Sequence, residues 1–306
     1  MNPAQYPQRT KKARISPYWL YSIPGFIGML FIIVIPLIGN VYLSFTKWSG
    51  VGDPKFIGLA NYTKLFSDEV FWKSFENTIY LIAAMVIIPT LIGLVLAAVL
   101  FDYIAKNFDG KVATFLRATY YIPQILPISV AGILWAWIFS PNTGAFNQIL
   151  RSVGLESWTR NWLGDPSTAM YAVMLVMVWV QIGYPVVIFM AAMSRIDLEL
   201  YEAADLDGAG WWRRFTAITV PMIRPEIFVI SLTCTIAALK SFAPVYTLTQ
   251  GGPENATNVP SYFAYQNFFT KGNVGYGASI STVLTILILI IAAVMIAYQF
   301  KTEKES

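Results

Sequence analysis

The chain has 306 residues, of which 56% are hydrophobic and 12% are charged, and its formal net charge is +4. A soluble domain carries about 25% charged residues, so this chain has about half the charge needed to cover a water-facing surface. The composition therefore indicates a membrane protein. The basic residues are spread over short loops and form no stripe, so they fit the flanks of membrane spans better than a nucleic-acid surface.

Catalytic residue types are scarce in this sequence. It contains no histidine, and its one cysteine, Cys234, lies inside an apolar run. This excludes Ser-His-Asp and Cys-His catalysis, a histidine-ligated zinc site and an intrachain disulfide framework. No pair of acidic residues falls within an expected span, and there is no G-x-x-x-x-G-K-[ST] loop for nucleotide phosphates. We therefore expect a chain that is not an enzyme and that binds no metal or cofactor itself.

Apolar runs, taken in chain order, predict the membrane spans. About 20 apolar residues cross the hydrocarbon core of a bilayer, where a charge costs about 2.5–3.5 kcal/mol. Runs without Asp, Glu, Lys or Arg cover residues 15–46, 77–101, 118–150, 166–194 and 272–300. A sixth run, 227–249, is interrupted only by Lys240. The sequence thus predicts an all-α membrane protein with six transmembrane helices in a single domain, residues 1–306.

The distribution of Lys and Arg predicts the orientation. If the N-terminus is cytoplasmic, 13 basic residues fall in inside segments and 7 in outside loops, with Lys240 set aside. Because basic residues are enriched on the cytoplasmic side, both termini are expected inside. The inside segments are then an N-terminal tail, 1–16, a loop between the fourth and fifth spans, 194–225, and a C-terminal tail, 301–306.

The inside loop 194–225 has the pattern of two short helices at a bend. Asp197 is placed to cap a helix, and Gly208 can adopt a positive φ that ends it. Trp211 and Phe215 then resume a helical spacing, and the bend between the two stretches is rich in small residues, which permits close approach by a partner. An interfacial amphipathic helix with Trp211 and Trp212 in the headgroup region is an equal alternative from physics alone.

The segment EAADLDGAGWWRRFTAITVPMIRP, residues 202–225, resembles the EAA loop of the membrane subunits of bacterial ABC importers. It matches the spacing EAA-x-x-DGA-x(5)-F-x-x-I-x-x-P-x-x-x-P throughout, although Asp197 stands where many relatives have proline. In that family the loop forms a coupling helix that docks in a cleft of the ATP-hydrolysing subunit, so we name residues 194–225 the coupling loop. The resemblance implies docking residues Glu202, Ala203, Ala204, Asp207, Gly208, Ala209, Trp211, Trp212, Arg213 and Phe215, with Glu202 and Gly208 at the bend.

Four further segments are similar to the carbohydrate-uptake permeases of maltose and multiple-sugar type. They are PLIGNVYLSFTKW at 36–48, FIGLANYTKLF at 56–66, NWLGDP at 161–166 and YTLTQGGPENAT at 246–257. The resemblance implies a non-catalytic permease subunit in the bacterial inner membrane that imports a sugar or oligosaccharide. The implied partners are a second, homologous permease subunit in a heterodimer, a dimer of ATP-binding subunits that holds ATP and Mg, and an extracytoplasmic solute-binding protein. Membrane lipid surrounds the chain, and no nucleic-acid partner is expected.

The outward half of the fifth span holds the candidate substrate path. Lys240 is the one ionisable residue inside an expected span, and such residues usually face a bundle interior or a water-filled cavity. The alternative is that its ammonium snorkels to the outer headgroups. Gln181 and the two tryptophans of the third span, Trp135 and Trp137, could add hydrogen bonds and rings, although Trp more often belongs to the interfacial belt. The expected path residues are Lys240, Ser241, Phe242, Tyr246, Gln181 and Trp135. Pro123, Pro127, Pro185 and Pro244 are expected to kink or open helices near this path.

Other transport roles stay open at this point. The same machinery could carry glycerol phosphate, an amino acid or an opine, but the spans contain no arginine for a phosphate. A stand-alone secondary transporter would favour intramembrane acids and an inverted repeat, and neither is visible. A membrane-embedded enzyme would need a polar constellation inside the spans, where only Lys240 and Gln181 are strong candidates. A structural membrane protein is the other alternative of a different class. The sequence does not specify the sugar.

Overall fold

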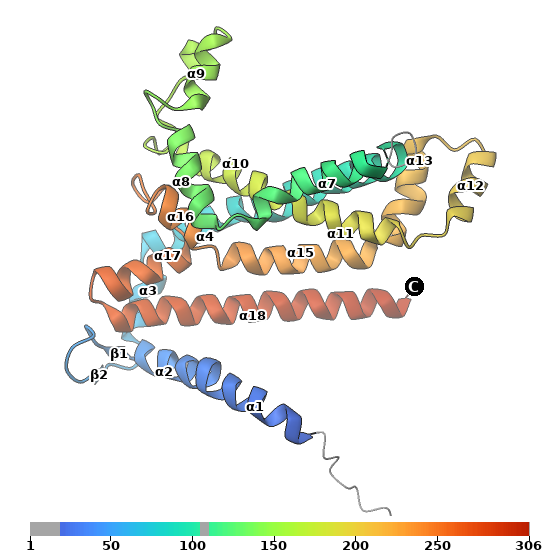
Figure 1. The fold of residues 1–306 in the computed structure, drawn as a ribbon. Coiled ribbons are helices and arrows are strands. Elements are labelled where there is room, and N and C mark those ends of the chain that lie inside the picture. Colours follow the sequence, from blue (N-terminus) through green and yellow to red (C-terminus); the bar gives the residue numbers. More distant parts are fainter. Residues whose placement is uncertain (1–18, 105–109, 306) are drawn as a thin grey trace, which may run out of the picture.

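Helices make up about three quarters of the computed structural model, which describes residues 19–104 and 110–305. Within those ranges the only strands are β1 (Thr46–Lys47) and β2 (Lys55–Phe56), which pair antiparallel. Long helices run side by side, with β1, β2, α3, α16 and α17 at one end of the bundle and α12 and α13 at the other (Figure 1). The predicted N-terminal tail, 1–16, lies outside the described residues. The predicted C-terminal tail, except its last residue, continues the final helix to Glu305.

Four helical stretches in the described residues are long and apolar enough to span a membrane: Trp19–Ser44, Glu69–Asp102, Ala169–Met193 and Val274–Lys301. Two bent pairs meet the same test together. Ala118–Ile125 and Ile128–Ile138 are bent by 101°, and Trp211–Met222 and Arg224–Leu239 are bent by 68°. The prediction of an all-α membrane protein is confirmed, and the predicted number of six is reached when each bent pair counts as one span.

The first two spans and their connection contain these elements: α1 (Trp19–Met29), η1 (Leu30–Val34), α2 (Ile35–Ser44), α3 (Ala60–Phe66), α4 (Glu69–Ile82), η2 (Ala83–Ile87), α5 (Ile88–Val99) and η3 (Leu100–Ile104). The third and fourth spans follow as α7 (Gly110–Ile125), α8 (Ile128–Ile138), α9 (Ala145–Ser152), η4 (Glu156–Trp158), α10 (Ala169–Gln181) and α11 (Gly183–Met193). The rest of the chain forms α12 (Leu198–Leu206), α13 (Trp211–Arg214), η5 (Phe215–Thr219), α14 (Val220–Met222), α15 (Arg224–Leu239), α16 (Ala243–Leu248), α17 (Pro260–Tyr265), η6 (Gln266–Thr270) and α18 (Val274–Glu305).

Three prolines stay inside long helical stretches because a wider turn precedes each of them. Pro36, Pro89 and Pro221 each stand at the second residue after a π-helical turn, namely η1, η2 and η5. Proline lacks the backbone N–H and its ring clashes with the carbonyl four residues earlier. Wider i→i+5 bonding moves that carbonyl away, so the helix continues where an α-helical ladder would break.

The fifth span differs from its prediction. The apolar run was expected to continue past Lys240, but α15 ends at Leu239 and Lys240 is its C-cap residue. The chain turns through Ser241 and Phe242 before α16 begins. Pro244 lies in the first turn of α16, where its missing N–H costs nothing. A charged residue therefore sits at a break between two helices and not within one continuous helix.

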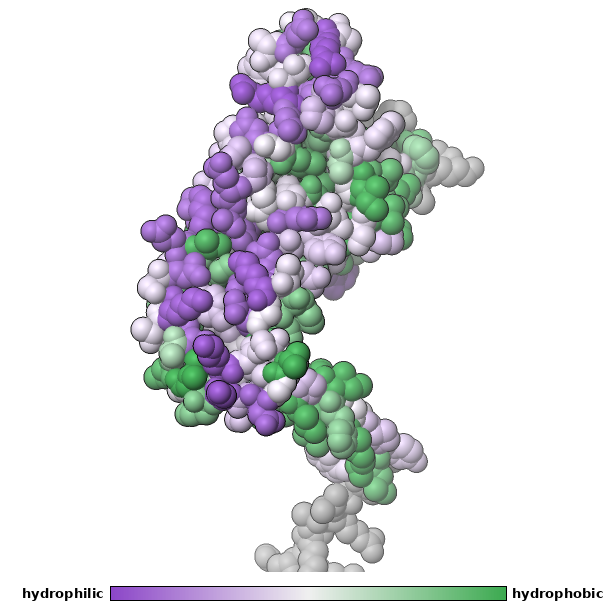
Figure 2. All heavy atoms as spheres, turned by 90° about the vertical axis from the view of Figure 1, so that its left-hand side faces the viewer, coloured by the Kyte–Doolittle hydropathy of each residue, from purple (hydrophilic) through white to green (hydrophobic). Residues whose placement is uncertain are grey.

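Three apolar clusters hold the described bundle together, the smallest of which joins α3, α4, α17 and α18 around Phe71, Phe263 and Ile280. Another joins α4, α8, α10 and α16 in the half next to the β1–β2 hairpin, around Val173, Val176 and Val245. The third joins α5, α11, α12 and α15 in the half next to α13, around Val186, Phe189 and Ile230. In the first span, no residue of the most apolar 18-residue stretch is buried, and the span contacts the bundle through α18. The end that carries the hairpin is largely hydrophilic, with hydrophobic flanks (Figure 2).

Candidate functional site

The coupling loop folds as the sequence predicts. The side chain of Asp197 accepts a hydrogen bond from the Glu199 backbone N–H at 3.0 Å and so caps α12. Gly208 follows the end of α12 with φ +73, a conformation that other residues adopt at a cost of about 1–2 kcal/mol. After Gly210 the chain enters α13 at Trp211. Two short helices therefore meet at a glycine bend, at the end of the bundle away from the β1–β2 hairpin (Figure 1).

Buried aromatic residues anchor this loop to the bundle. Tyr201 and Phe215 are both buried and belong to the cluster around Phe189. The Tyr201 hydroxyl lies 2.9 Å from Thr219 Oγ1, and burial raises the pKa of this tyrosine, so it remains a neutral hydrogen-bonding group. Because these contacts come from both sides of the bend, α12 cannot move without the start of the fifth span.

Trp211 links the coupling loop to another span. Its indole N–H donates to Asp102 Oδ2 at 2.9 Å, at the end of the second span, and its ring stacks on Phe215 with a centroid separation of 5.2 Å. Trp211 and Phe215 were predicted as docking residues for a partner. The structure instead places both side chains against the chain's own helices, because each is large and apolar enough to fill the space beneath the bend.

The opposite charges of the loop form ion pairs within it. Arg214 pairs with Asp205 across the bend, and Arg195 pairs with Glu226 at the start of α15. The first pair ties α12 to α13, and the second ties the end of the fourth span to the fifth. Exposed pairs of this kind contribute about 0–1 kcal/mol each, so their main effect is to restrict the geometry.

The remaining predicted docking residues present a free surface. Six of them are exposed: Glu202, Ala203, Asp207, Gly208, Trp212 and Arg213, whereas Ala204 and Ala209 are half-buried. Beside them lie three exposed leucines that the sequence reasoning missed, Leu198, Leu200 and Leu206, the last with 91% of its surface exposed. Their signal was an apolar residue repeated through a helix that is otherwise acidic. Leu198 and Leu206 share the face of α12 that carries Glu202, whereas Leu200 lies on another side of the helix. Exposed apolar residues on such a face indicate a contact with a partner protein.

At the other end of the fifth span, four rings form an aromatic cluster beside Lys240. Phe242 stacks on Tyr246 at 5.3 Å between centroids, and Tyr265 contacts these two rings at 5.0 and 5.7 Å. Tyr262, which is buried, completes the cluster. Tyr262 and Tyr265 come from α17, which the sequence reasoning did not include in the path. Their signal was the Tyr-x-x-Tyr spacing, which places both rings on one face of a helix.

Ser241 and Lys240 occupy the break before this cluster. The Ser241 carbonyl accepts a hydrogen bond from Ser261 Oγ, which ties the break to α17. The Ser241 hydroxyl is buried and has no hydrogen-bond partner among the described residues. Lys240 is exposed and forms no ion pair within the described part of the chain. Four of the six predicted path residues, Lys240, Ser241, Phe242 and Tyr246, therefore lie together.

Gln181 and Trp135 do not join this group. Gln181 is buried, and its side-chain amide donates to Cys234 Sγ at 3.0 Å, so it fastens α10 to α15. Trp135 packs edge-on against Trp179 at 5.5 Å between centroids. Sequence spacing placed both residues at a suitable depth, but the rotation of each helix directs their side chains into helix contacts. Trp137 on the same helix is exposed.

The halves of the third and fifth spans that follow their breaks, α8 and α16, pack closely. After the 101° bend, Pro127 precedes α8, and α8 lies against α16. At their contact, a Cβ on Gly132 would lie 2.9 Å from the Cβ of Thr247 and closer still to its hydroxyl. Only glycine permits this approach, so the two segments that follow the breaks are held together as one unit.

Comparison with known proteins gives a consistent picture. The family described as binding-protein-dependent transport system inner membrane component matches residues 90–302. The "Probable ABC transporter permease protein YurN" of Bacillus subtilis is 39% identical over 95% of this chain and 98% of its own length. The trehalose/maltose transport system permease protein MalF of Thermococcus litoralis is 32% identical over 89% of each chain. The diacetylchitobiose uptake system permease protein NgcF of Streptomyces coelicolor is 35% identical over 90% of this chain and 79% of its own.

Two solved structures share the fold. One is a bacterial ABC transporter involved in the import of the acidic polysaccharide alginate, with a TM-score of 0.81 at 22% identity, over 93% of this chain and 96% of that chain. The other is the alginate transporter in complex with a periplasmic protein bound to an alginate pentasaccharide, with a TM-score of 0.78, also at 22% identity, over 91% and 92%. At this identity the likeness concerns the arrangement of the helices.

Proposed function

Because the chain belongs to the family of inner membrane components of binding-protein-dependent transport systems, we propose that it is the membrane-spanning permease subunit of an ABC importer for a sugar or oligosaccharide. Several relatives are named for carbohydrates, among them trehalose and maltose, diacetylchitobiose and lactose. The chain covers these relatives over most of their length, so the proposal concerns the whole subunit. ATP hydrolysis resides in a separate subunit.

The observation that carries the proposal is the anchored coupling loop with its exposed outer face. Leu198, Glu202 and Leu206, spaced four residues apart, share one exposed face of α12, and this face forms a surface for an ATP-binding subunit. On its inner side, the loop is fixed to the second span through Asp102, and within the loop Tyr201 joins α12 to Thr219 at the end of η5, which leads into α15. Movement of the ATP-binding subunit then shifts both spans as rigid bodies and alternates the cavity between inward and outward access.

The substrate path follows the aromatic cluster on the other end of the fifth span. Tyr246 and Tyr265 combine a ring face with a hydroxyl, which suits the mixed apolar and polar surface of a sugar. The free ammonium of Lys240 at the helix break adds a hydrogen-bond donor. Gln181 and Trp135 are packing residues in this arrangement and line no part of the path.

Two further partners complete the assembly, one in the membrane and one on its outer side. A second, homologous permease subunit would cover the exposed apolar faces of the first span and of α8, and the cavity would form between the two subunits. A solute-binding protein would deliver the sugar to the outer end, where a shallow groove of about 600 Å³ is lined by Glu69, Trp72, Lys73, Glu76, Glu254 and neighbouring residues. One structural relative is described in complex with a periplasmic protein. When the coupling loop faces the cytoplasm, both termini are cytoplasmic and the groove faces the outside of the membrane.

Uptake by reconstituted vesicles tests the proposal. The chain is inserted with the second permease subunit and the ATP-binding subunits. A ligand screen that includes maltodextrins first identifies the sugar that the cognate binding protein takes up. The labelled sugar is then supplied together with that protein. Uptake should require ATP inside the vesicles and should be stopped by vanadate. Uptake driven by a proton gradient after removal of the ATP-binding subunit would contradict the proposal.

A further inference from the structure

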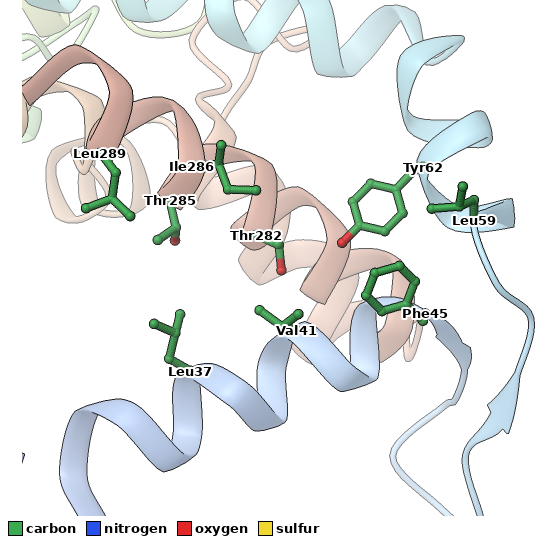
Figure 3. A pocket seen from close by; sticks show the side chains of 9 residues that line it. All are labelled: Leu37, Val41, Phe45, Leu59, Tyr62, Thr282, Thr285, Ile286 and Leu289. Atoms are coloured by element: carbon green, nitrogen blue, oxygen red, sulfur yellow. The ribbon is translucent and has the colours of Figure 1, made fainter. Parts of the chain in front are cut away.

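An apolar slot lies between the first and last spans, away from both sites described above. Leu37, Val41 and Phe45 line it from α2, and Thr282, Ile286 and Leu289 line it from α18 (Figure 3). Its volume is about 390 Å³. Leu59 and Tyr62 close the end next to the β1–β2 hairpin. Ile286 and Leu289 are more than half exposed, so the slot is open on one side.

The interior of this slot offers no polar group to a ligand. The hydroxyls of Thr282 and Thr285 donate to backbone carbonyls one turn earlier in α18, and Thr282 also accepts from Asn40. The Tyr62 hydroxyl lies 2.6 Å from Ser44 Oγ. Because each of these polar atoms already has a partner, the slot suits hydrocarbon and not a sugar or an ion.

The length of the slot matches one leaflet of a bilayer. Leu37 and Phe45 are eight residues apart in α2, which corresponds to about 12 Å along the helix. Half of the hydrocarbon core is about 15 Å thick. The slot therefore runs from the membrane surface, where the hairpin lies, toward the bilayer centre, and its depth is that of a single acyl chain.

Two lysines belong to the β1–β2 hairpin, which follows the end of the slot closed by Leu59 and Tyr62. Lys47 and Lys55 are opposite each other in the β1–β2 ladder, and Phe45 of the slot stacks on Phe56 next to Lys55. Like charges in this arrangement destabilise a strand pair. Both lysines are exposed, and neither forms an ion pair with any described residue. An anion placed between the two ammonium groups would remove their repulsion.

We propose that this slot binds one anionic phospholipid, whose acyl chain fills the space between α2 and α18 and whose phosphate lies at Lys47 and Lys55. With the coupling loop in the cytoplasm, this lipid belongs to the outer leaflet. The first span has little other contact with the bundle, so the bound lipid becomes part of the packing that sets the angle between α2 and α18. The site does not depend on which solute the transporter carries.

Lipid retention tests the headgroup contact. The complete transporter, with its partner subunits, is reconstituted in nanodiscs of mixed phosphatidylglycerol and phosphatidylcholine, released, and analysed by native mass spectrometry. One phosphatidylglycerol should remain on this subunit. The double variant Lys47→Gln, Lys55→Gln should retain it about tenfold less and lose the preference over phosphatidylcholine. The matched control is Lys73→Gln in the same outer region, which should retain it as the wild type does. Equal retention in the double variant would overturn the proposal.

The acyl-chain position has its own test, which also identifies a competing occupant. A photoreactive benzoylphenylalanine in place of Leu289, at the open side of the slot, should form an adduct with a phospholipid on irradiation in the membrane. An adduct with a peptide of the second permease subunit would instead show that a partner helix fills the slot, and the proposal would then be wrong. Val41→Trp should block the slot and abolish lipid retention, whereas Ile290→Trp, exposed on α18 outside the slot, should not.

Discussion

The indole N–H of Trp211 donates to Asp102 Oδ2 over 2.9 Å, which joins the coupling loop to the end of the second span. Together with the Tyr201–Thr219 contact, this makes the loop a rigid extension of two spans. A surface that binds an ATP-binding subunit needs such an attachment, because a loop that moved by itself would transmit no displacement to the helices.

The variant Trp211→Phe should uncouple transport from ATP hydrolysis. It removes the hydrogen bond but keeps a ring to stack on Phe215, so the cost in stability should be about 1 kcal/mol. We expect sugar uptake to fall severalfold while the ATP-binding subunit still co-purifies. The control is Trp212→Phe, because Trp212 is exposed and has no hydrogen bond to Asp102. Equal coupling ratios in the two variants would contradict a force-bearing role for Trp211.

The variants Glu202→Lys and Gly208→Trp should abolish transport while the protein remains inserted in the membrane. The first reverses the charge on the exposed face, and the second adds a side chain to a residue with φ +73. Loss of the ATP-binding subunit on co-purification is the measurement. Gly210→Ala is the control, since Gly210 has φ −65 and open space around it. If both variants kept normal ATPase coupling, this face would not be the docking surface.

The variant Gly132→Ala should disrupt the contact between α8 and α16. The new methyl group would overlap Thr247, and overpacking of this kind costs about 1–3 kcal/mol. Uptake and thermal stability of the purified complex should both fall. The double variant Gly132→Ala, Thr247→Gly restores the space and should recover part of the loss, whereas Gly39→Ala, which meets nothing within 4 Å, should be neutral. If Thr247→Gly did not restore uptake and stability, the defect of Gly132→Ala would not come from overlap with Thr247.

The variant Lys240→Met should change the apparent affinity for the sugar more than the expression level. Lys240 lies at the helix break beside the aromatic cluster, and Met keeps the length of the side chain without its charge. The measurement is the KM for uptake with saturating binding protein. An unchanged KM and rate would mean that the ammonium only reaches the outer headgroups.

The variant Tyr265→Ala should raise the KM for uptake severalfold, because it removes a ring that contacts both Phe242 and Tyr246. Tyr265→Phe keeps the ring and should retain most of the affinity. The two variants together separate ring contact from the hydroxyl. A larger rise in KM for Tyr265→Phe than for Tyr265→Ala would be inconsistent with stacking of the ring on the sugar.

Local patterns were sufficient to locate the apolar spans and the coupling loop of this protein, but not the break of the fifth span at Lys240. Charge-free runs predicted the spans because a charge is costly in hydrocarbon wherever the helix packs. Asp197 and Gly208 predicted the helix cap and the bend because both depend on the backbone of a few adjacent residues. The two short helices and their bend could therefore be predicted from these residues, whereas the coupling role was implied by the resemblance to the EAA loop.

The direction in which each side chain points was decided by the tertiary structure. Trp211 and Phe215 looked like docking residues, but Asp102, 109 residues away from Trp211 in the chain, draws the indole inward. Gln181 lay at the right depth for a path, yet Cys234 on another helix takes its amide. Tyr265 joined the aromatic cluster, and Lys47 met Lys55 beside an apolar slot, through packing between separate elements. Sequence periodicity fixes the face on which a residue lies relative to its own helix, whereas the rotation of that helix depends on all its neighbours at once.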